Sequence, residues 1–586
     1  MIADLDPRAA PGTVAEAATS PLLALRRVSC RYADSTTPAL RDVDFEVAAG
    51  EIVAVMGHSG AGKSTLLKCL TGIVPGFERA EVSGTRMAFS ATIEGLRPGD
   101  LAGRVGIVFQ DFEAQLFSTN VTLEVGFAPQ QLGLPRATIL ARTEAALARV
   151  GLAGFAARDP ATLSGGEKQR LALAGILALE PRVILLDEPT TDIDPEGKRA
   201  VLALLHTLRA AGVAVVIVEH EILAAEAADR LVLLSAGSVL AHGPSATLLG
   251  ETELLEACGV RPRDVDVLRR RLGLAAVAGI ADVASTEREL RAAGLPALLE
   301  VTSTAGPAGG AERGRDSPAL LDVRDVRFAY GDRPAALDGV SLRIESGEFV
   351  ALIGQNGSGK TTLAKHLNGL LSPDQGSVLL GGVDMRGLRL GEIARQVGFV
   401  FQDPDHQLFC ASVEEEVAYG PRHHLLAGSE LAARVDRALE VCGLSDRRAE
   451  DPFLLRKGER QRLAVAAVLA IDPRVLVLDE PTTGLDHREQ LAILALLADL
   501  NRAGRTVIVI THSPWLVAEH ASRAVLMAKG RVLFDGGIRE LFRADTELAA
   551  ASFVLPDATR LGLRFGVAVR SVDELADRVA DARRPR

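Results

Sequence analysis

A phosphate-loop pattern sets the tightest constraint on what this chain can fold into. The segment reads Gly57-His58-Ser59-Gly60-Ala61-Gly62-Lys63-Ser64, which matches G-x-x-x-x-G-K-[ST] at every fixed position, and it follows the apolar run 52–56. Glycines let successive backbone N–H groups face an anion, while Lys63 can neutralise phosphate charge and Ser64 can ligate Mg²⁺. The segment therefore predicts a strand, a loop and a helix that bind a nucleoside triphosphate, although alone it could be a glycine-rich turn.

A second copy of the pattern removes that ambiguity. Residues 354–361 read Gly354-Gln355-Asn356-Gly357-Ser358-Gly359-Lys360-Thr361, after the strand-like run 349–353. Lys63 and Lys360 stand 297 positions apart, whereas every later landmark repeats at an interval of 292. The chain is therefore an internal duplication, with five extra residues between Lys63 and Gln110 that we expect in a surface loop.

Length and composition favour a cytoplasmic protein of several domains. At 586 residues the chain is too long for one core, so roughly two to four domains are expected. The sequence has no stretch of about 18 uncharged apolar residues, so we expect no membrane span. The first residues include Asp4, Asp6 and Glu16, which is atypical of a secretion signal and predicts a loose leader.

Cysteines and net charge argue against two further classes. The five cysteines are scattered without C-x-x-C pairs, so neither a disulfide framework nor a cysteine metal site is expected. A formal charge of −11 argues against non-specific binding to the phosphate backbone of nucleic acids. We therefore expect no redox chemistry and no nucleic-acid partner.

Four landmarks follow each phosphate loop in the same order. They are a strand-ending glutamine (Gln110, Gln402), a helix start of Leu-Ser-Gly-Gly type (163–166, 455–458), an Asp-Glu pair after an apolar run (Asp187-Glu188, Asp479-Glu480) and a strand-end histidine (His220, His512). Alone, the glutamine could be an ordinary polar residue at the end of a strand, the helix start could be an ordinary N-cap, and the histidine could be a packing residue. Adjacent carboxylates at the end of a buried strand are costly unless they meet a metal or a donor. Repetition of the whole order favours a functional interpretation.

This order of motifs resembles the nucleotide-binding domains of ATP-binding cassette (ABC) proteins over residues 22–250 and 320–540. The resemblance implies an α/β chain of two P-loop NTPase (RecA-like) domains, each with an antiparallel β subdomain, a helical subdomain and a small C-terminal extension. It also implies ATP hydrolysis with ATP and Mg²⁺ as cofactors. In this family two domains close head to tail, and each ATP lies between one half's phosphate loop and the other half's signature. The chemistry would be mainly positioning and charge stabilisation.

The resemblance assigns a role to each matching position. Catalytic roles, polarising the attacking water or contacting the γ-phosphate, fall on Gln110, Glu188, His220, Gln402, Glu480 and His512. Mg²⁺ ligation, direct or through water, falls on Ser64, Gln110, Asp187, Thr361, Gln402 and Asp479. Adenine stacking falls on Tyr32 and Tyr330. The other nucleotide-binding positions are both phosphate loops with Thr65 and Thr362, the signatures Ser164, Gly165, Gly166, Glu167, Arg456, Lys457, Gly458 and Glu459, and Asp194 and Asp486, which would report across the dimer.

A finer pattern after each glutamine resembles the ATPases of energy-coupling-factor (ECF) importers of vitamins and of cobalt or nickel. Residues 401–409 read Phe-Gln-Asp-Pro-Asp-His-Gln-Leu-Phe, and residues 413–421 read Val-Glu-Glu-Glu-Val-Ala-Tyr-Gly-Pro. The first half keeps a looser version, with Phe112 in place of Pro404. An apolar and acidic groove at this place would suit a coupling helix of a membrane partner, whereas the ordinary alternative is a plain helical surface.

The second signature departs from the family pattern. Arg456 and Lys457 replace the residue types found at Ser164 and Gly165. In head-to-tail closure the altered signature would meet the first phosphate loop, and the intact one would meet the second. We therefore expect unequal sites, with most turnover at the site of Lys360, although the two cations could still hold a γ-phosphate.

The sequence predicts six segments along the chain. They are a disordered leader (1–21), a first ABC ATPase domain (22–250), its C-terminal extension (251–301), a flexible linker (302–318), a second ABC ATPase domain (319–546) and its C-terminal extension (547–586). The two extensions resemble those through which ECF ATPases pair, although an ordinary helical cap is the alternative.

The expected function is that of the ATP-hydrolysing energy-coupling subunit of an ECF-type importer for a vitamin or a transition-metal ion. Its expected partners are an integral-membrane transmembrane coupling subunit and a substrate-binding membrane subunit, at the cytoplasmic face of the cell membrane. One alternative is the twin-cassette ATPase of a sugar importer. A soluble ribosome-associated ABC factor is less favoured, because it would need a charged helical linker and basic surfaces.

Overall fold

The chain divides into two compact units. The computed structural model describes residues 20–191, 193, 195–274, 279–295, 319–331 and 333–583. The division falls between Pro262 and Arg263, so the second unit contains the second phosphate loop together with described residues 263–274 and 281–295. Most of the predicted leader, residues 1–19, and the predicted linker, residues 302–318, lie outside the described residues.

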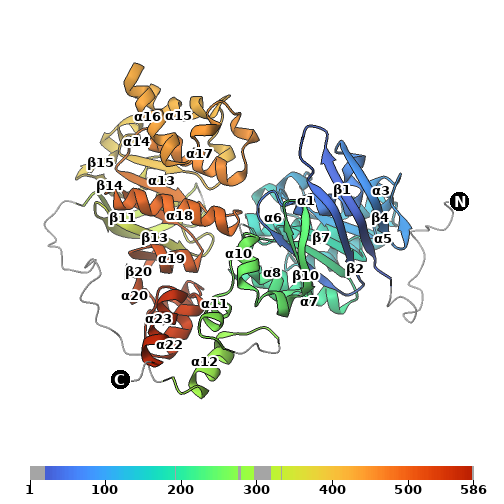
Figure 1. The fold of residues 1–586 in the computed structure, drawn as a ribbon. Coiled ribbons are helices and arrows are strands. Elements are labelled where there is room, and N and C mark those ends of the chain that lie inside the picture. The colour runs from blue at the N-terminus through green and yellow to red at the C-terminus, as the bar shows by residue number, and fades with distance from the viewer. Residues whose placement is uncertain are drawn as a thin grey trace. The chain divides into compact units, whose positions relative to one another are not determined.

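Two sheets form the frame of the first unit (Figure 1). The antiparallel sheet has the strand order β2-β1-β4-β5, and the larger sheet has the order β10-β9-β3-β8-β7-β6. All neighbours in the larger sheet are parallel except β9 and β10. The strands are β1 (Leu23–Tyr32), β2 (Leu40–Val47), β3 (Ile52–Gly57), β4 (Ala80–Ala88), β5 (Ala91–Thr92), β6 (Val105–Val108), β7 (Val183–Asp187), β8 (Ala214–Val218), β9 (Arg230–Ser235) and β10 (Ser238–Pro244).

Helices cover the larger sheet of the first unit and build a helical subdomain. The α-helices are α1 (Lys63–Thr71), α2 (Ile73–Gly76), α3 (Pro98–Leu101), α4 (Val121–Gln131), α5 (Arg136–Arg149), α6 (Gly165–Leu177), α7 (Pro195–Ala210), α8 (Ile222–Ala227), α9 (Ser245–Leu248) and α10 (Thr252–Ala257). Short 3₁₀ turns lie at η1 (Glu113–Gln115) and η2 (Pro160–Thr162).

Strand β3 is buried on both faces, which fixes the start of the first phosphate loop. Ile52, Ala54 and Met56 contribute to a core shared with helices α4, α5 and α6, whereas Val53 and Val55 contribute to a core shared with α1 and the antiparallel sheet. Alternate residues of a strand point to opposite faces, and a strand covered on both faces therefore needs a continuous apolar run.

The extra residues of the first half lie between α1 and β5. Strand β5 begins 28 residues after Lys63, whereas the equivalent strand β15 (Val383–Asp384) begins 23 residues after Lys360. In this interval the first unit has the short helix α2 and a β4 of nine residues. The insertion is therefore partly structured rather than a plain loop, although Phe77 within it is exposed.

The second unit repeats this pair of sheets, with the orders β12-β11-β14-β15 and β16-β17-β18-β13-β19-β20. Again the larger sheet is parallel except for its last pair, β19 and β20. The remaining strands are β11 (Leu321–Phe328), β12 (Leu337–Ile344), β13 (Phe349–Gly354), β14 (Gln375–Leu380), β16 (Val397–Val400), β17 (Val475–Asp479), β18 (Thr506–Ile510), β19 (Arg523–Ala528) and β20 (Arg531–Gly537).

The helices of the second unit include two that precede the linker in sequence. They are α11 (Asp264–Arg271), α12 (Val283–Ala292), α13 (Lys360–Leu367), α14 (Leu390–Ala394), α15 (Val413–His423), α16 (Gly428–Val441), α17 (Lys457–Leu469), α18 (His487–Arg502), α19 (Pro514–His520), α20 (Ile538–Leu541), α21 (Asp545–Ala550), α22 (Asp557–Arg564) and α23 (Val572–Arg583). Short 3₁₀ turns lie at η3 (Met385–Gly387), η4 (Pro404–His406), η5 (Ser445–Arg447) and η6 (Pro452–Leu454).

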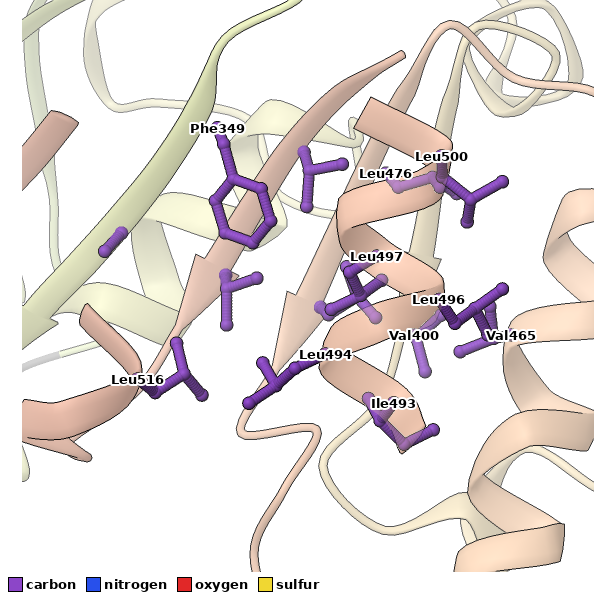
Figure 2. Close-up of a cluster of buried hydrophobic side chains, with 14 of the residues drawn as sticks. Phe349, Val400, Val465, Leu476, Ile493, Leu494, Leu496, Leu497, Leu500 and Leu516 are labelled. Atoms are coloured by element: carbon purple, nitrogen blue, oxygen red, sulfur yellow. The ribbon is translucent and has the colours of Figure 1, made fainter. Parts of the chain in front are cut away.

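Figure 2 shows how helix α18 packs on the larger sheet of the second unit. Ile493, Leu497 and Leu500 recur at helical spacing and face the buried cluster that includes Leu476 of β17. Leu516 of α19 belongs to the same cluster, so the core also holds the helix that follows β18.

Helices α11, α12, α22 and α23 share a small core of their own. It contains Leu268 of α11, Leu290 of α12, Leu561 of α22 and Leu575 of α23, all fully buried or nearly so. Segments from before and after the second cassette are thus joined in one hydrophobic cluster. In the parts of the chain that the structure describes, no helix is both long enough and apolar enough to span a bilayer.

Candidate functional site

The first phosphate loop connects β3 to α1 and folds around the ammonium group of its lysine. Lys63 is buried, and its Nζ donates hydrogen bonds to the carbonyl oxygens of Gly57 at 2.8 Å and His58 at 3.1 Å. Gly62 has a φ of 100°, and a Cβ at this position would overlap the carbonyl oxygen of Ala39. The glycine is therefore required by both conformation and space, and it keeps the loop open at the amino end of α1.

The second phosphate loop has the same geometry between β13 and α13. Lys360 Nζ donates to the carbonyl oxygens of Gly354 at 2.8 Å and Gln355 at 2.9 Å. Gly359 has a φ of 100° and lies against the carbonyl oxygen of Ala336. Each loop thus places a positive charge and a helix amino terminus at one point, which is the arrangement that binds phosphate.

The predicted metal-binding aspartates lie next to the phosphate loops. The hydroxyl of Ser64 donates a hydrogen bond to the carboxylate of Asp187, which is buried, and burial raises the pKa of Asp187 to about 6. Thr361 bonds in the same way to Asp479, whose pKa burial also raises to about 6. Burial removes a carboxylate from water and disfavours its charged form, and here this effect exceeds the opposing effect of the nearby Lys63 and Lys360.

The residues around Asp187 fit a hard divalent cation. Asp187 Oδ1 is buried and has no hydrogen-bond partner, so it can still ligate a cation. Oxygen ligands of this kind are the ones that Mg²⁺ prefers. Among the residues that the structure describes, no group of three or more His, Cys, Asp or Glu side chains could hold a metal, so phosphate and water would supply most ligands.

Glu188 lies at the centre of a polar network in the first unit. Gln110 Nε2 donates to Glu188 Oε2 at 2.8 Å, and His220 Nε2 lies 2.9 Å from Glu188 Oε1. The backbone of Glu188 has a φ of 50° and donates to the carbonyl oxygen of Val218. A left-handed backbone is uncommon for glutamate, and here it holds the carboxylate between two strand ends.

Glu480 occupies the equivalent place in the second unit with a different contact. Its backbone has a φ of 46° and donates to the carbonyl oxygen of Ile510. His512 approaches Glu480 Oε1 with Nδ1, at 2.9 Å, rather than with Nε2. Gln402 is exposed, two residues after β16. The structure therefore brings glutamate and histidine together in both units.

Both predicted adenine-stacking tyrosines are attached to the helix after the phosphate loop. The hydroxyl of Tyr32 lies 3.2 Å from Thr65 Oγ1, and that of Tyr330 lies 3.3 Å from Thr362 Oγ1. Tyr330 is exposed and also packs edge-on against Phe328. The tyrosines are thus held beside the phosphate loops of their own units.

The signature segments begin helices α6 and α17. Ser164 caps α6, because its hydroxyl accepts from the backbone of Glu167 while the Glu167 carboxylate accepts from the backbone of Ser164 at 2.8 Å. Arg456 takes the cap position of α17, where its backbone N–H donates to Glu459 Oε2 at 2.9 Å. Gly165, Gly166, Lys457 and Gly458 form the first turns of these helices.

Lys457 extends toward residues that follow the Asp-Glu pair of its own unit. Its Nζ covers Gly484, where a Cβ would collide with it. Asp486 is buried and caps α18 by accepting from the backbone of Glu489 at 2.9 Å. Asp194, the matching aspartate of the first half, lies outside the described residues.

One charged residue beside the first site was not singled out from the sequence. Glu219 is 1% exposed, and its Oε1 accepts from the backbone of Thr190 at 2.8 Å and from the Thr190 hydroxyl. Burial and the neighbouring carboxylates Glu221 and Glu188 raise the pKa of Glu219 to about 7. The equivalent residue of the second half is Thr511, so comparing the residues that precede the two histidines would have found it.

Comparison with known proteins places these two sites in a family. The family model described as "ABC transporter" matches residues 40–191 and 337–483. An ABC transporter ATP-binding protein of Caldanaerobacter subterraneus subsp. tengcongensis is 39% identical over 92% of this chain and 95% of its own length. One of Methanosarcina acetivorans is also 39% identical, over 93% of this chain and 90% of its own length.

Among solved structures, cbiO1 from Clostridium perfringens, described as part of the ABC transporter complex cbiONQ, is 34% identical to this chain. It covers 43% of this chain and 100% of its own, with a TM-score of 0.38. The predicted fold of two P-loop NTPase domains is confirmed by the family match and by the repeated sheets. This chain belongs to the ABC transporter family, and it carries two of the family's ATP-binding, ATP-hydrolysing domains.

Proposed function

We propose that this chain is the energy-coupling ATPase subunit of an ECF-type importer that takes up a vitamin or a transition-metal ion. In this proposal it works at the cytoplasmic face of the membrane with a transmembrane coupling subunit and a substrate-binding membrane subunit. The supporting observation is a pair of exposed aromatic rings in each unit, in the segment that follows the predicted catalytic glutamine and whose sequence resembles ECF ATPases.

The aromatic pair of the first unit is held rigidly at the surface. Phe117 is 62% exposed and packs edge-on against Phe127 of α4, with ring centroids 4.6 Å apart. The buried Glu124 accepts hydrogen bonds from the backbone N–H groups of Phe117 at 3.0 Å and Ser118 at 2.7 Å. A carboxylate is thus used to fix a loop whose aromatic side chain faces solvent.

The second unit repeats the arrangement residue for residue. Phe409 is 61% exposed and packs edge-on against Tyr419 of α15, with centroids 4.7 Å apart. Glu416 accepts from the backbone N–H groups of Phe409 and Cys410, each at 2.8 Å. Large exposed aromatics on a fixed backbone are typical of binding surfaces, and a partner helix would bury them.

In each unit a glutamine two residues before the exposed phenylalanine binds the backbone of the residue that precedes the predicted catalytic glutamine. Gln115 Oε1 accepts from the backbone of Phe109 at 2.9 Å, and Gln407 Oε1 accepts from that of Phe401 at 3.3 Å. Phe109 precedes Gln110, which contacts Glu188. Movement of a partner helix at the surface and rearrangement at Glu188 are therefore coupled by a short segment of chain.

The residues of each site have complementary tasks in ATP hydrolysis. Lys63 and the loop N–H groups would hold the β- and γ-phosphates, and bound Mg²⁺ would neutralise part of their charge. Glu188 would orient the attacking water and accept its proton, while His220 holds the Glu188 carboxylate in place. ATP then favours the closed arrangement of the domains because only that arrangement completes the contacts to its phosphates.

Affinity purification of the full chain from its own host tests the proposal. We expect integral-membrane proteins to co-purify with the parent chain and to be lost when Phe117→Ser and Phe409→Ser are combined. Leu240→Ser, at an exposed apolar residue of β10, is the matched control and should retain them. Nucleotide binding of each variant reports whether it is folded. Salt-sensitive recovery of ribosomes in place of membrane proteins would overturn the proposal.

A further inference from the structure

Arg570 connects the C-terminal extension to the helix that follows the catalytic histidine of the second unit. Helix α19 begins at Pro514, two residues after His512, and it ends at His520. Arg570 Nε donates to the carbonyl oxygen of Ala518 at 2.7 Å, and Nη2 donates to those of Glu519 at 3.1 Å and Ala521 at 2.6 Å. One guanidinium thus satisfies three carbonyl groups at the end of a short helix.

This contact is strong because the carbonyl end of a helix carries partial negative charge. A cation at this end stabilises the helix, and Arg presents several N–H donors in a fixed plane. Burial and the nearby Arg539 lower the pKa of Arg570, although that group stays charged. Removal of the guanidinium would leave the carbonyl groups of Ala518, Glu519 and Ala521 without these hydrogen bonds.

The segment that carries Arg570 is itself fixed on both sides. The backbone N–H of Arg570 donates to Glu574 at 2.9 Å, and Glu574 also contacts Arg539 of α20 at 2.8 Å. Val567 and Val569 belong to the core of the extension, whereas Ala568 between them belongs to the core of the cassette. The loop between α22 and α23 therefore ties the two cores together and presents Arg570 to α19.

The extension core includes residues from the chain that follows the first cassette. Leu268 and Leu290 pack in it together with Phe565. Glu287 of α12 pairs with Arg564 at 2.5 Å, and Asp264 accepts from the backbone of Ala558 at 3.1 Å. A change in the position of α11 or α12 would therefore reach the loop that holds Arg570.

We propose that Arg570 is a positioning residue for His512, through which the paired extensions set the activity of the second ATP site. Helix α19 is held at one end by Leu516 in the cassette core (Figure 2) and at the other by Arg570, so its first turn and the preceding His512 take a defined place against Glu480.

The inference rests on the catalytic role proposed for His512 and not on the identity of the transport partner. ATP hydrolysis by the purified full chain therefore tests it. We expect Arg570→Ala to lower kcat by about tenfold while the KM for ATP changes by less than about twofold, because the nucleotide contacts remain and the alignment is lost. Arg570→Lys should recover part of the activity, since an ammonium group can still reach a carbonyl oxygen.

Two controls separate positioning from loss of structure. Arg560→Ala removes an exposed arginine of the same extension, which pairs with Asp557, and should leave kcat unchanged. His512→Ala provides the second control: if Arg570 acts through His512, Arg570→Ala lowers the activity of this variant no further. Fluorescence of Trp515, in the first turn of α19, should shift in Arg570→Ala and not in Arg560→Ala.

The outcomes distinguish the inference from the proposals on which it rests. Equal activities of Arg570→Ala and Arg560→Ala, or an additive loss on the His512→Ala background, would overturn the role of Arg570. Full activity of His512→Ala would overturn the role of His512 first. Neither result depends on which membrane proteins bind the chain.

Discussion

Gln110 and Glu188 are joined by a hydrogen bond of 2.8 Å between Nε2 and Oε2, which links the second residue after β6 to the first residue after β7. The Glu188 carboxylate also contacts Nε2 of His220, whereas the Glu480 carboxylate contacts Nδ1 of His512. The two glutamates therefore have different surroundings, although the order of motifs around them is the same. Differences between the two sites can be measured one residue at a time.

Substitution of the two glutamates should reveal unequal sites. In the head-to-tail pairing that the sequence predicts, Glu480 works with the intact signature at Ser164, and Glu188 works with Arg456 and Lys457. We expect Glu480→Gln to lower steady-state ATP hydrolysis by about 100-fold and Glu188→Gln by no more than about tenfold. Phosphate release by the purified chain is the measurement, and a larger loss from Glu188→Gln would reverse the assignment.

Glu219 should make the first unit less stable as the pH rises. Burial raises the pKa of Glu219 to about 7 in the folded chain, above the 4.5 of an exposed glutamate, so the folded state holds this proton more tightly than the unfolded state does. Stability is then lost as the pH rises from about 4.5 to about 7, by on the order of 3 kcal/mol. Glu219→Gln should remove this loss, because an amide oxygen can still accept from Thr190.

Calorimetry at about pH 5 and about pH 8 checks this expectation. The Glu219→Gln chain should unfold at a higher temperature than the parent at the higher pH and at a similar temperature at the lower one. Glu46→Gln changes an exposed carboxylate on β2 and serves as the control. An equal shift at both pH values would show that titration of Glu219 is not the cause.

Tyr330 should contribute to nucleotide affinity through its ring rather than its hydroxyl. Tyr330→Ala removes the stacking surface and should raise the Kd for ATP by about five- to tenfold, which corresponds to about 1 kcal/mol. Tyr330→Phe removes only the hydrogen bond to Thr362 and should change the Kd by less than about threefold. Titration with a fluorescent ATP analogue distinguishes the two, and equal effects would argue against stacking.

Trp515 should report nucleotide binding at the second site. It is the one tryptophan of the sequence, and its ring lies 5.7 Å from that of His487 and 6.1 Å from that of His520. Because α19 begins two residues after His512, closure around ATP should change the emission of Trp515 in the Glu480→Gln chain. Lys360→Ala should abolish this change and Lys63→Ala should reduce it less. If ATP does not change the emission of Trp515 in any variant, the expectation is wrong.

The local parts of both sites could be predicted from the sequence for a physical reason. Strands β3 and β13 begin where the apolar runs 52–56 and 349–353 begin, and each ends one residue later than the run that predicts it. A phosphate loop needs glycine at fixed positions because of backbone conformation and close approach, as Gly62 shows, and such needs are visible in one short segment.

Contacts between distant segments could not be predicted in the same way. Arg570 reads as an ordinary arginine after an apolar triplet, and only the packing of α22 and α23 brings it to the end of α19. From the sequence, Lys457 is only a replacement of the glycine that the signature normally has. The structure shows in addition that its side chain lies against Gly484. The assignment to ECF importers and the domain bounds stay predictions, since they rest on motif resemblance.

The shared core of α11, α12, α22 and α23 has a consequence for how the polypeptide could be divided. A protease that cuts between residues 302 and 318 would sever the backbone, yet the fragments would remain attached through Leu268, Leu290, Leu561 and Leu575. Splitting the gene at Pro262 instead would place α11 and α12 on the product that contains the second cassette, and the shared core would then no longer join the two products. If two separate genes replaced this one, the shared core would still join the two products only if the break fell after α12.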